Sequence, residues 1–399
     1  MQNLKGVVVR ILQIADLHLG KKLVEFDRIG EQREVLEEII DIADENDVPI
    51  VLVAGDIFDS FNPSAEANEL LYRFLKRISK NGKRAVVAIA GNHDSADRIE
   101  SPDPLAKECG IIFAGYAYLK RRDFELDSGL KVKFLEPGIM EVNIADYSYP
   151  ARIIYFPYAN EQRLKKYLGE HDKKEEGLRK EVSRIWNELA NKYFNDNSVN
   201  LLVAHLFMTN LRFAVEILSE NFMTNNKMNL EESDDEKSIL HPGGLEMFSV
   251  DDLPKNADYI ALGHLHKPVV LCEKPYVVYS GSPLPYSLSE KEQDKCVFVF
   301  EKSTEQVGSL KRIPLKKGKK IKSATFSSVS NALAWLEKNQ DCYAELKIKT
   351  KNYLTGESIK QLKEAHPFII AIVPLVENET VENSDYDIDL NADIKELSV

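Results

Sequence analysis

The sequence has few cysteines and no long apolar run. Its four cysteines lie far apart, with no C-x-x-C pair, which argues against a disulfide framework and a zinc ribbon. No stretch reaches the roughly 18 apolar residues that a membrane-spanning helix needs. The amino-terminal stretch is broken by Lys5, Arg10 and Asp16, so no signal peptide is expected. These absences predict a cytoplasmic protein without a membrane segment.

The chain also lacks a phosphate-binding loop of the form G-x-x-x-x-G-K-[ST]. That loop holds nucleotide phosphates through its backbone N–H groups. We therefore expect no nucleotide site in this chain, and any ATP dependence has to come from a partner.

An overall positive charge is lacking as well, since the formal net charge is −12. Residues 377–399 hold eight acids and one lysine, whereas residues 311–322 hold seven basic residues and no acid. We expect 377–399 to be a flexible tail. The basic segment 311–322 is either a solvated strand edge or a contact to a phosphate backbone.

Short apolar runs alternate with amphipathic segments through much of the chain. Strands are predicted at 7–15, 50–54, 85–90, 199–204 and 259–262, and helices at 31–46 and 64–82. Ser64 is the expected N-cap of the second helix. Strands and helices that alternate in this way predict an α/β sheet with right-handed crossovers.

A strand–helix–strand–helix–strand pattern over residues 324–376 predicts a second, small α/β domain. We therefore expect a main domain over 1–285, a capping domain over 286–376 that includes the basic segment, and the acidic tail 377–399.

Five of the predicted strands stop at metal-binding residue types. The residues at these ends are Asp16 and His18, Asp56, Asn92 to Asp94, His205, and His264 and His266. Functional residues gather beyond the carboxyl ends of strands in open α/β sheets, so these ends can converge. His264 and His266 are two apart and can face the same side of an extended backbone.

The ligand types indicate which metal is bound. Carboxylate, imidazole and carboxamide without thiolate suit Mn²⁺ or Fe²⁺ better than a structural zinc site. The ligands are too many for one ion, and two ions that share a carboxylate lie about 3.5 to 4 Å apart. Two divalent ions would carry more positive charge than the carboxylates of Asp16 and Asp56 neutralise, and the remaining positive charge favours a phosphate.

The segments DLHLG, GDIFD, GNHD and GHLH, with a histidine after an intervening β run, together resemble the calcineurin-like metallophosphoesterase family. The resemblance implies a two-sheet β-sandwich flanked by helices, with a small C-terminal α/β capping domain. The motif spacing, the stretch SGSPL at 280–284 and the small terminal unit are similar to the DNA-repair nucleases of this family. The resemblance covers about residues 7–376.

The resemblance implies a role for each motif residue. One ion would be held by Asp16, His18, Asp56 and His266, and the other by Asp56, Asn92, His205 and His264. His93 would protonate the leaving 3′ oxygen. Asp94 would either orient His93 or cap a turn. Asp59 stands where some relatives have a phosphate-contacting histidine, and Arg98 is a candidate for that contact.

The resemblance further implies Mn²⁺-dependent exonuclease action on duplex DNA ends and endonuclease action on single strands or hairpins. The expected partners are DNA, an ATPase subunit, and a second copy of this chain that meets the helix at 64–80. Two alternatives stay open. The chain could hydrolyse a small phosphodiester or phosphomonoester such as a cyclic nucleotide, or it could tether DNA ends with metals that are only structural.

Overall fold

The computed structural model describes residues 8–147, 149–160, 163, 174–209, 248–291, 293–303, 308–351 and 354–376. The chain divides between Ile321 and Lys322 into two compact units. The acidic tail 377–399 lies outside the described residues. Among the described helices, none is long and apolar enough to span a bilayer.

The first unit contains a six-stranded mixed sheet. In spatial order its strands are β16 (Ser309–Pro314), β15 (Cys296–Ser303), β1 (Val8–Ile14), β2 (Ile50–Ala54), β3 (Ala85–Ile89) and β4 (Ile111–Ala114). Strands β1 to β4 run parallel. On the other side of β1, β15 pairs antiparallel with β1, and β16 pairs antiparallel with β15. The four parallel strands therefore end at one edge of the sheet.

The second sheet of this unit has eight strands. In spatial order these are β13 (Val269–Glu273), β14 (Tyr276–Tyr279), β12 (Tyr259–Gly263), β9 (Val199–His205), β8 (Ala151–Phe156), β7 (Ile139–Asn143), β6 (Lys131–Glu136) and β5 (Phe124–Glu125). Strands β8, β9, β12 and β14 are parallel. A short parallel pair, β10 (Met208–Thr209) and β11 (Phe248–Ser249), forms a separate two-stranded sheet.

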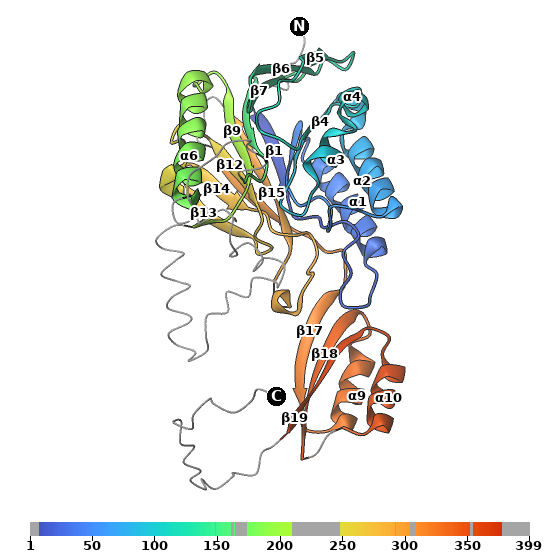
Figure 1. Ribbon diagram of the computed structural model, residues 1–399. Helices are drawn as coiled ribbons and strands as arrows, with labels where there is room; N and C mark the ends of the chain where they lie inside the picture. The colour runs from blue at the N-terminus through green and yellow to red at the C-terminus, as the bar shows by residue number, and fades with distance from the viewer. Residues whose placement is uncertain are drawn as a thin grey trace, which may run out of the picture. The chain divides into compact units, whose positions relative to one another are not determined.

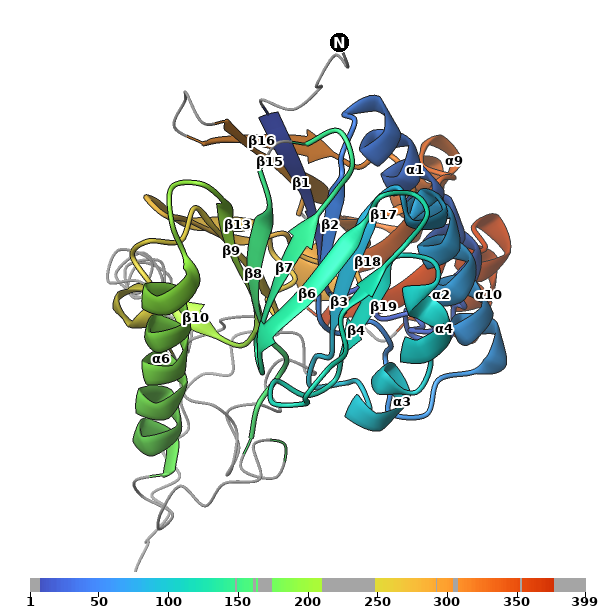
Figure 2. The same cartoon turned by 90° about the horizontal axis from the view of Figure 1, so that it is seen from above.

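The two sheets face each other, and helices cover their outer faces (Figures 1 and 2). Four of the helices are α1 (Ile29–Glu45), α2 (Ala65–Ile78), α3 (Ala96–Glu100) and α4 (Asp103–Lys107), and they lie on the side of the six-stranded sheet. Helix α6 (Lys174–Tyr193) covers the eight-stranded sheet on the opposite side. This arrangement confirms the helix-flanked sandwich that the family resemblance implies.

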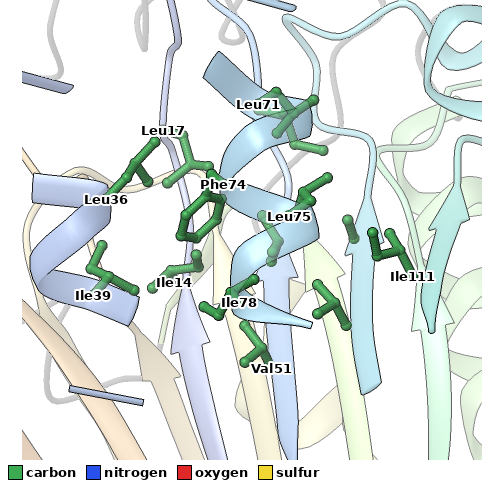
Figure 3. Close-up of a cluster of buried hydrophobic side chains, with 14 of the residues drawn as sticks. Ile14, Leu17, Leu36, Ile39, Val51, Leu71, Phe74, Leu75, Ile78 and Ile111 are labelled. Atoms are coloured by element: carbon green, nitrogen blue, oxygen red, sulfur yellow. The ribbon is translucent and has the colours of Figure 1, made fainter. Parts of the chain in front are cut away.

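The period-2 geometry of the strands builds separate cores on the two faces of the six-stranded sheet. In β1, Val9 and Ile11 face the eight-stranded sheet. Leu12 and Ile14 face the helices, where Phe74 of α2 packs among them (Figure 3). Because both of their faces are covered, β2 and β3 read as continuous apolar runs, whereas Arg10 and Gln13 interrupt the run of β1.

The second unit is a three-stranded sheet with two helices. It comprises β17 (Lys320–Phe326), whose first two residues precede the boundary, α9 (Val329–Lys338), β18 (Cys342–Thr350), α10 (Gly356–Ala365) and β19 (Ile369–Val376). Its core joins Leu336 of α9 and Leu362 of α10 to Leu346 of β18. The predicted strand–helix–strand–helix–strand order is confirmed.

The domain boundary expected at 285/286 differs from the boundary in the structure. Strand β15 pairs with β1 over six residue positions, and β16 pairs with β15. Residues 286–321 therefore belong to the first unit, and with them most of the basic segment 311–322. Residues 286–321 and the strands that follow them have similar β-rich sequences, so the local pattern does not show which sheet each joins. Long-range pairing determines it.

The N-cap of α2 offers a test of the local structure. The Ser64 hydroxyl accepts a hydrogen bond from Ala67 N at 3.1 Å, which satisfies one of the free N–H groups at the helix start. We expect Ser64→Ala to lower the free energy of unfolding by about 1 kcal/mol, measured by urea denaturation. Ser95→Ala is the matched control, because Ser95 caps α3 without a side-chain hydrogen bond. An equal loss in both variants would contradict the prediction.

Candidate metal centre

The predicted ligands meet at one end of the sandwich. Those from the six-stranded sheet follow β1, β2 and β3, and are Asp16, His18, Asp56 and Asn92. Those from the eight-stranded sheet end or follow β9 and β12, and are His205, His264 and His266. The site thus lies where parallel strands of two sheets end, whereas the strand pattern alone suggested a single sheet. A direct link joins the sheets, since His264 N donates to Asp16 Oδ1 at 2.9 Å.

One half of the site gathers around two facing imidazoles. His18 Nε2 lies 3.0 Å from His266 Nε2 and 3.7 Å from Asp56 Oδ2. Asp16 Oδ2 is buried, and it has no hydrogen-bond partner among the described residues. Asp16, His18 and Asp56 form one group of potential metal ligands.

The other half gathers around His205. Its Nε2 lies 2.8 Å from Asn92 Oδ1 and 3.5 Å from Asp56 Oδ2. Its Nδ1 lies 2.9 Å from the carbonyl oxygen of Ala54, which can only accept, so Nδ1 carries a hydrogen. The His264 ring completes this half, 5.5 Å from the His205 ring between centroids. Asp56 Oδ2 thus faces both halves.

Burial shapes the protonation of these groups. Burial lowers the pKa of His18 to about 4; together with the neighbouring His205, it lowers the pKa of His264 to about 3. Both imidazoles are therefore neutral, as metal ligation requires. Burial raises the pKa of Asp16 to about 7.

His205 compensates charge at the centre. Burial opposes its protonation, but the carboxylates of Asp56 and Asp16 outweigh this effect and raise the pKa of His205 to about 9. Burial likewise opposes the ionisation of Asp56, yet the charge of His205 holds the pKa of Asp56 well below its ordinary value. The protonated imidazole thus occupies the electrostatic role that a cation would fill.

Four of the ligand residues have strained backbones. Asp16, His18, Asp56 and His264 have positive φ angles of 52°, 42°, 47° and 113°, a conformation that non-glycine residues rarely adopt. Two glycines permit the close packing around them. A Cβ at Gly91 would lie 2.0 Å from Asp56 Oδ1, and one at Gly263 would lie 1.7 Å from the oxygen of Ala54. Strain of this kind is concentrated at functional sites.

His93 lies beside the ligands. Its ring meets the His18 ring edge-on, 4.9 Å between centroids, and its Nδ1 lies 3.1 Å from the carbonyl oxygen of Asp59. The carboxylate of Asp59 lies 3.5 Å from His18 Nδ1 and 3.0 Å from Lys21 Nζ. His93, His18 and Asp59 form a second group of potential ligands.

The Asp94 side chain closes the turn that begins at Gly91, which is one of the two roles predicted for it, and the His93 ring is hydrogen-bonded elsewhere. The Asp94 carboxylate accepts from the backbone N–H groups of Ile57, Phe58 and Gly91. It therefore ties the two ligand loops together, and the hydrogen-bond partner of His93 is the Asp59 carbonyl. Arg98 is exposed on α3 and donates to Asn62.

Three buried or partly buried charges escaped the sequence analysis. Arg163 donates to the carbonyl oxygens of Gly91 at 2.9 Å and Asp94 at 2.6 Å, which braces the loop that carries Asn92. Glu290 and Lys295 lie behind His266. Their segment is rich in charge and reads as a solvated loop, and only the neighbouring stretch at 280–284 hinted at a functional role.

Comparison with known proteins agrees with this geometry. The calcineurin-like phosphoesterase family matches residues 9–268, which include every predicted ligand. The chain belongs to this family. Calcineurin-like phosphoesterases hold two divalent metal ions, and Asp56 Oδ2 has imidazole donors on both sides, His18 and His205.

The chain is also similar to relatives of known name. The chain is 29% identical over 376 residues to the SbcD subunit of the nuclease SbcCD from Bacillus subtilis, covering 93% of this chain and 87% of the relative. It is 30% identical over 295 residues to the protein of the same name from Rhodobacter capsulatus, covering 73% and 66%. A dimetal phosphatase from Danio rerio is a remote structural neighbour, with 11% identity, a TM-score of 0.36, and coverage of 77% and 99%.

The donor set fits two divalent ions. His266 Nε2 keeps its lone pair and lies 3.0 Å from His18 Nε2, so either a proton on His18 Nε2 or a cation has to lie between the two nitrogens. The unpartnered oxygen of Asp16 carries the same requirement, because a buried carboxylate needs compensation.

The close approach of Gly91 to Asp56 yields a test. We expect Gly91→Ala to destabilise the protein by about 1 to 3 kcal/mol and to reduce the number of bound Mn²⁺ ions, because the new methyl group displaces the carboxylate. Denaturation and metal analysis after gel filtration measure the two effects. Gly30→Ala is the control, since a Cβ there meets nothing within 4 Å; it should keep both ions. Full metal content in Gly91→Ala would show that the packing is not required.

Proposed function

We propose that the chain is the nuclease subunit of an SbcCD-type complex, a Mn²⁺-dependent 3′–5′ exonuclease on duplex DNA ends and an endonuclease on single strands or hairpins. Its partner would be an SbcC-type ATPase in cytoplasmic DNA repair and recombination. The observation that carries the proposal is the placement of the His93 ring against His18, beside donors that gather on both sides of Asp56. The names of the two relatives support it.

The proposed ligands follow the two halves of the site. Asp16, His18 and His266 would hold one ion, Asn92, His205 and His264 the other, and Asp56 would bridge them, since its Oδ2 faces both His18 and His205. Oxygen and nitrogen donors without thiolate suit Mn²⁺.

When bound, two divalent ions supply Lewis-acid chemistry that polarises a phosphodiester and lowers the pKa of water. The chain's own residues provide orientation and charge. The carboxylates of Asp16 and Asp56 would neutralise only part of the charge of two divalent ions, so the occupied site would remain positive and attract a phosphate. The backbone contacts of Asp94 and Arg163 keep the ligand loops in place.

His93 is the proposed general acid. Its Nδ1 donates to the carbonyl oxygen of Asp59, so Nε2 is the nitrogen that transfers a proton. The oxygen of a water molecule bonds to phosphorus and that water loses one proton to the solvent, the bond from phosphorus to the 3′ oxygen breaks, and the 3′ oxygen takes the proton of His93 Nε2. General acid catalysis of this type contributes about 10² to 10⁴ in rate.

The proposed complex also gives roles to the second unit, the basic segment 311–322 and helix α2. The second unit, β17 to β19 with α9 and α10, would contact DNA, and the basic segment 311–322 supplies cations for a phosphate backbone. Helix α2, where Tyr72 is 44% exposed, would form a homodimer within a heterotetramer.

A substrate panel tests the proposal. The metal-free chain is supplied with Mn²⁺ and given a DNA hairpin, a duplex end, a cyclic nucleotide and a phosphomonoester. We expect hairpin cleavage to be fastest, with products that retain a 5′ phosphate. Preference for the cyclic nucleotide or the monoester would favour the small-substrate alternative, and binding of DNA without cleavage would favour an end tether.

The role of His93 has its own test. We expect His93→Gln to bind both Mn²⁺ ions with unchanged affinity and to cleave DNA about 10²-fold more slowly or worse, because the proton donor is lost and the ligands remain. Metal titration and single-turnover cleavage measure the two properties. Loss of an ion from this variant would instead make His93 a ligand together with His18 and Asp59.

A further inference from the structure

A buried carboxylate lies behind one of the histidine ligands. Glu290, in the 3₁₀ turn η5 (Leu288–Glu290), is 2% exposed. Its Oε1 lies 3.1 Å from His266 Nδ1. A carboxylate can only accept, so Nδ1 carries the hydrogen and Nε2 keeps its lone pair. That lone pair faces His18 Nε2 at 3.0 Å.

Glu290 is itself fixed from several directions. Lys295 Nζ donates to Glu290 Oε2, to Ser282 Oγ at 2.9 Å and to the carbonyl oxygen of His266 at 3.0 Å. Ser282 Oγ lies 3.2 Å from Glu290 Oε2, and Tyr286 N donates to Oε1 at 3.1 Å. Lys295 is 7% exposed. The network thus holds both the ring and the backbone of His266.

The two halves of the site differ in this support. His205 Nδ1 is held by a neutral backbone carbonyl, that of Ala54. His266 is held by an ionised carboxylate that pairs with a lysine. A carboxylate behind an imidazole orients the ring and strengthens it as a donor to a metal.

We propose that Glu290, fixed by Lys295, is a positioning residue for the half of the metal centre that contains His18 and His266, and for that half alone. This inference rests on the proposed metal centre. It assigns a function to a charged segment that the ligand motifs do not include.

The experiment is a double-mutant cycle in metal affinity. Binding of Mn²⁺ to the metal-free full chain is followed by the electron paramagnetic resonance signal of free Mn²⁺. In a His205→Ala background, where the His18/His266 half remains, Glu290→Gln should weaken the remaining ion about 10- to 100-fold. In a His266→Ala background, Glu290→Gln should change the affinity of the remaining ion by less than about 2-fold, because coupling requires contact.

Matched variants separate positioning from folding. Glu100→Gln removes another carboxylate that pairs with a cation, Arg121, and accepts from backbone N–H groups outside the site; its metal affinity should be that of the unmodified chain. If Glu290→Gln does not fold, Glu290→Gln with Lys295→Met removes both buried charges, and the same one-sided loss is expected.

The outcomes are distinct. An equal effect of Glu290→Gln in both backgrounds, or none in the His205→Ala background, overturns the inference while the metal centre stands. Failure of the unmodified chain to bind Mn²⁺ at all overturns the proposed centre itself.

Discussion

Negative charge buried between two sheets is the constraint on which the site depends. Asp16 is 0% exposed and Asp56 is 2% exposed, and burial of an uncompensated carboxylate is costly. His205 lies between them, with Nε2 3.5 Å from Asp56 and Nδ1 3.9 Å from Asp16. His205 pairs mainly with Asp56, whereas burial raises the pKa of Asp16 to about 7, and the second oxygen of Asp16 has no hydrogen-bond partner among the described residues. The fold therefore creates a demand for cations at the place where its parallel strands end.

The rest of the sandwich makes this arrangement tolerable. Positive φ angles at Asp16, His18, Asp56 and His264 each cost about 1 to 3 kcal/mol. The strands before these residues are apolar on both faces and buried in two cores, so the loops have no freedom to relax. Gly91 and Gly263 remove the side chains that would keep the loops apart. Packing far from the ligands thus holds the ligands in a strained conformation.

Much of this was predictable from the sequence, and the remainder was not for definite reasons. Apolar runs that stop at Asp16, Asp56 and Asn92 identify strand ends, since local pattern determines where a strand stops. Local pattern does not identify pairing partners. Val8 pairs with Ser303, and this contact places β15 in the first unit. Glu290 was missed because its segment is charged, and its burial depends on Lys295, a partner that no periodicity reveals.

Side chains from three segments, Tyr286, Gln32 and Lys295, fix the two loops of the His18/His266 half. Tyr286 donates its hydroxyl hydrogen to the carbonyl oxygen of Leu17, and Gln32 Nε2 donates to the carbonyl oxygen of His18 at 2.8 Å. On the other side, Lys295 holds the carbonyl oxygen of His266. Both ligand backbones are therefore fixed by hydrogen bonds that involve no metal. Ligands that are already ordered lose little conformational entropy when an ion binds. The entropic cost of ordering them is therefore part of the free energy of folding and does not reduce the free energy of metal binding.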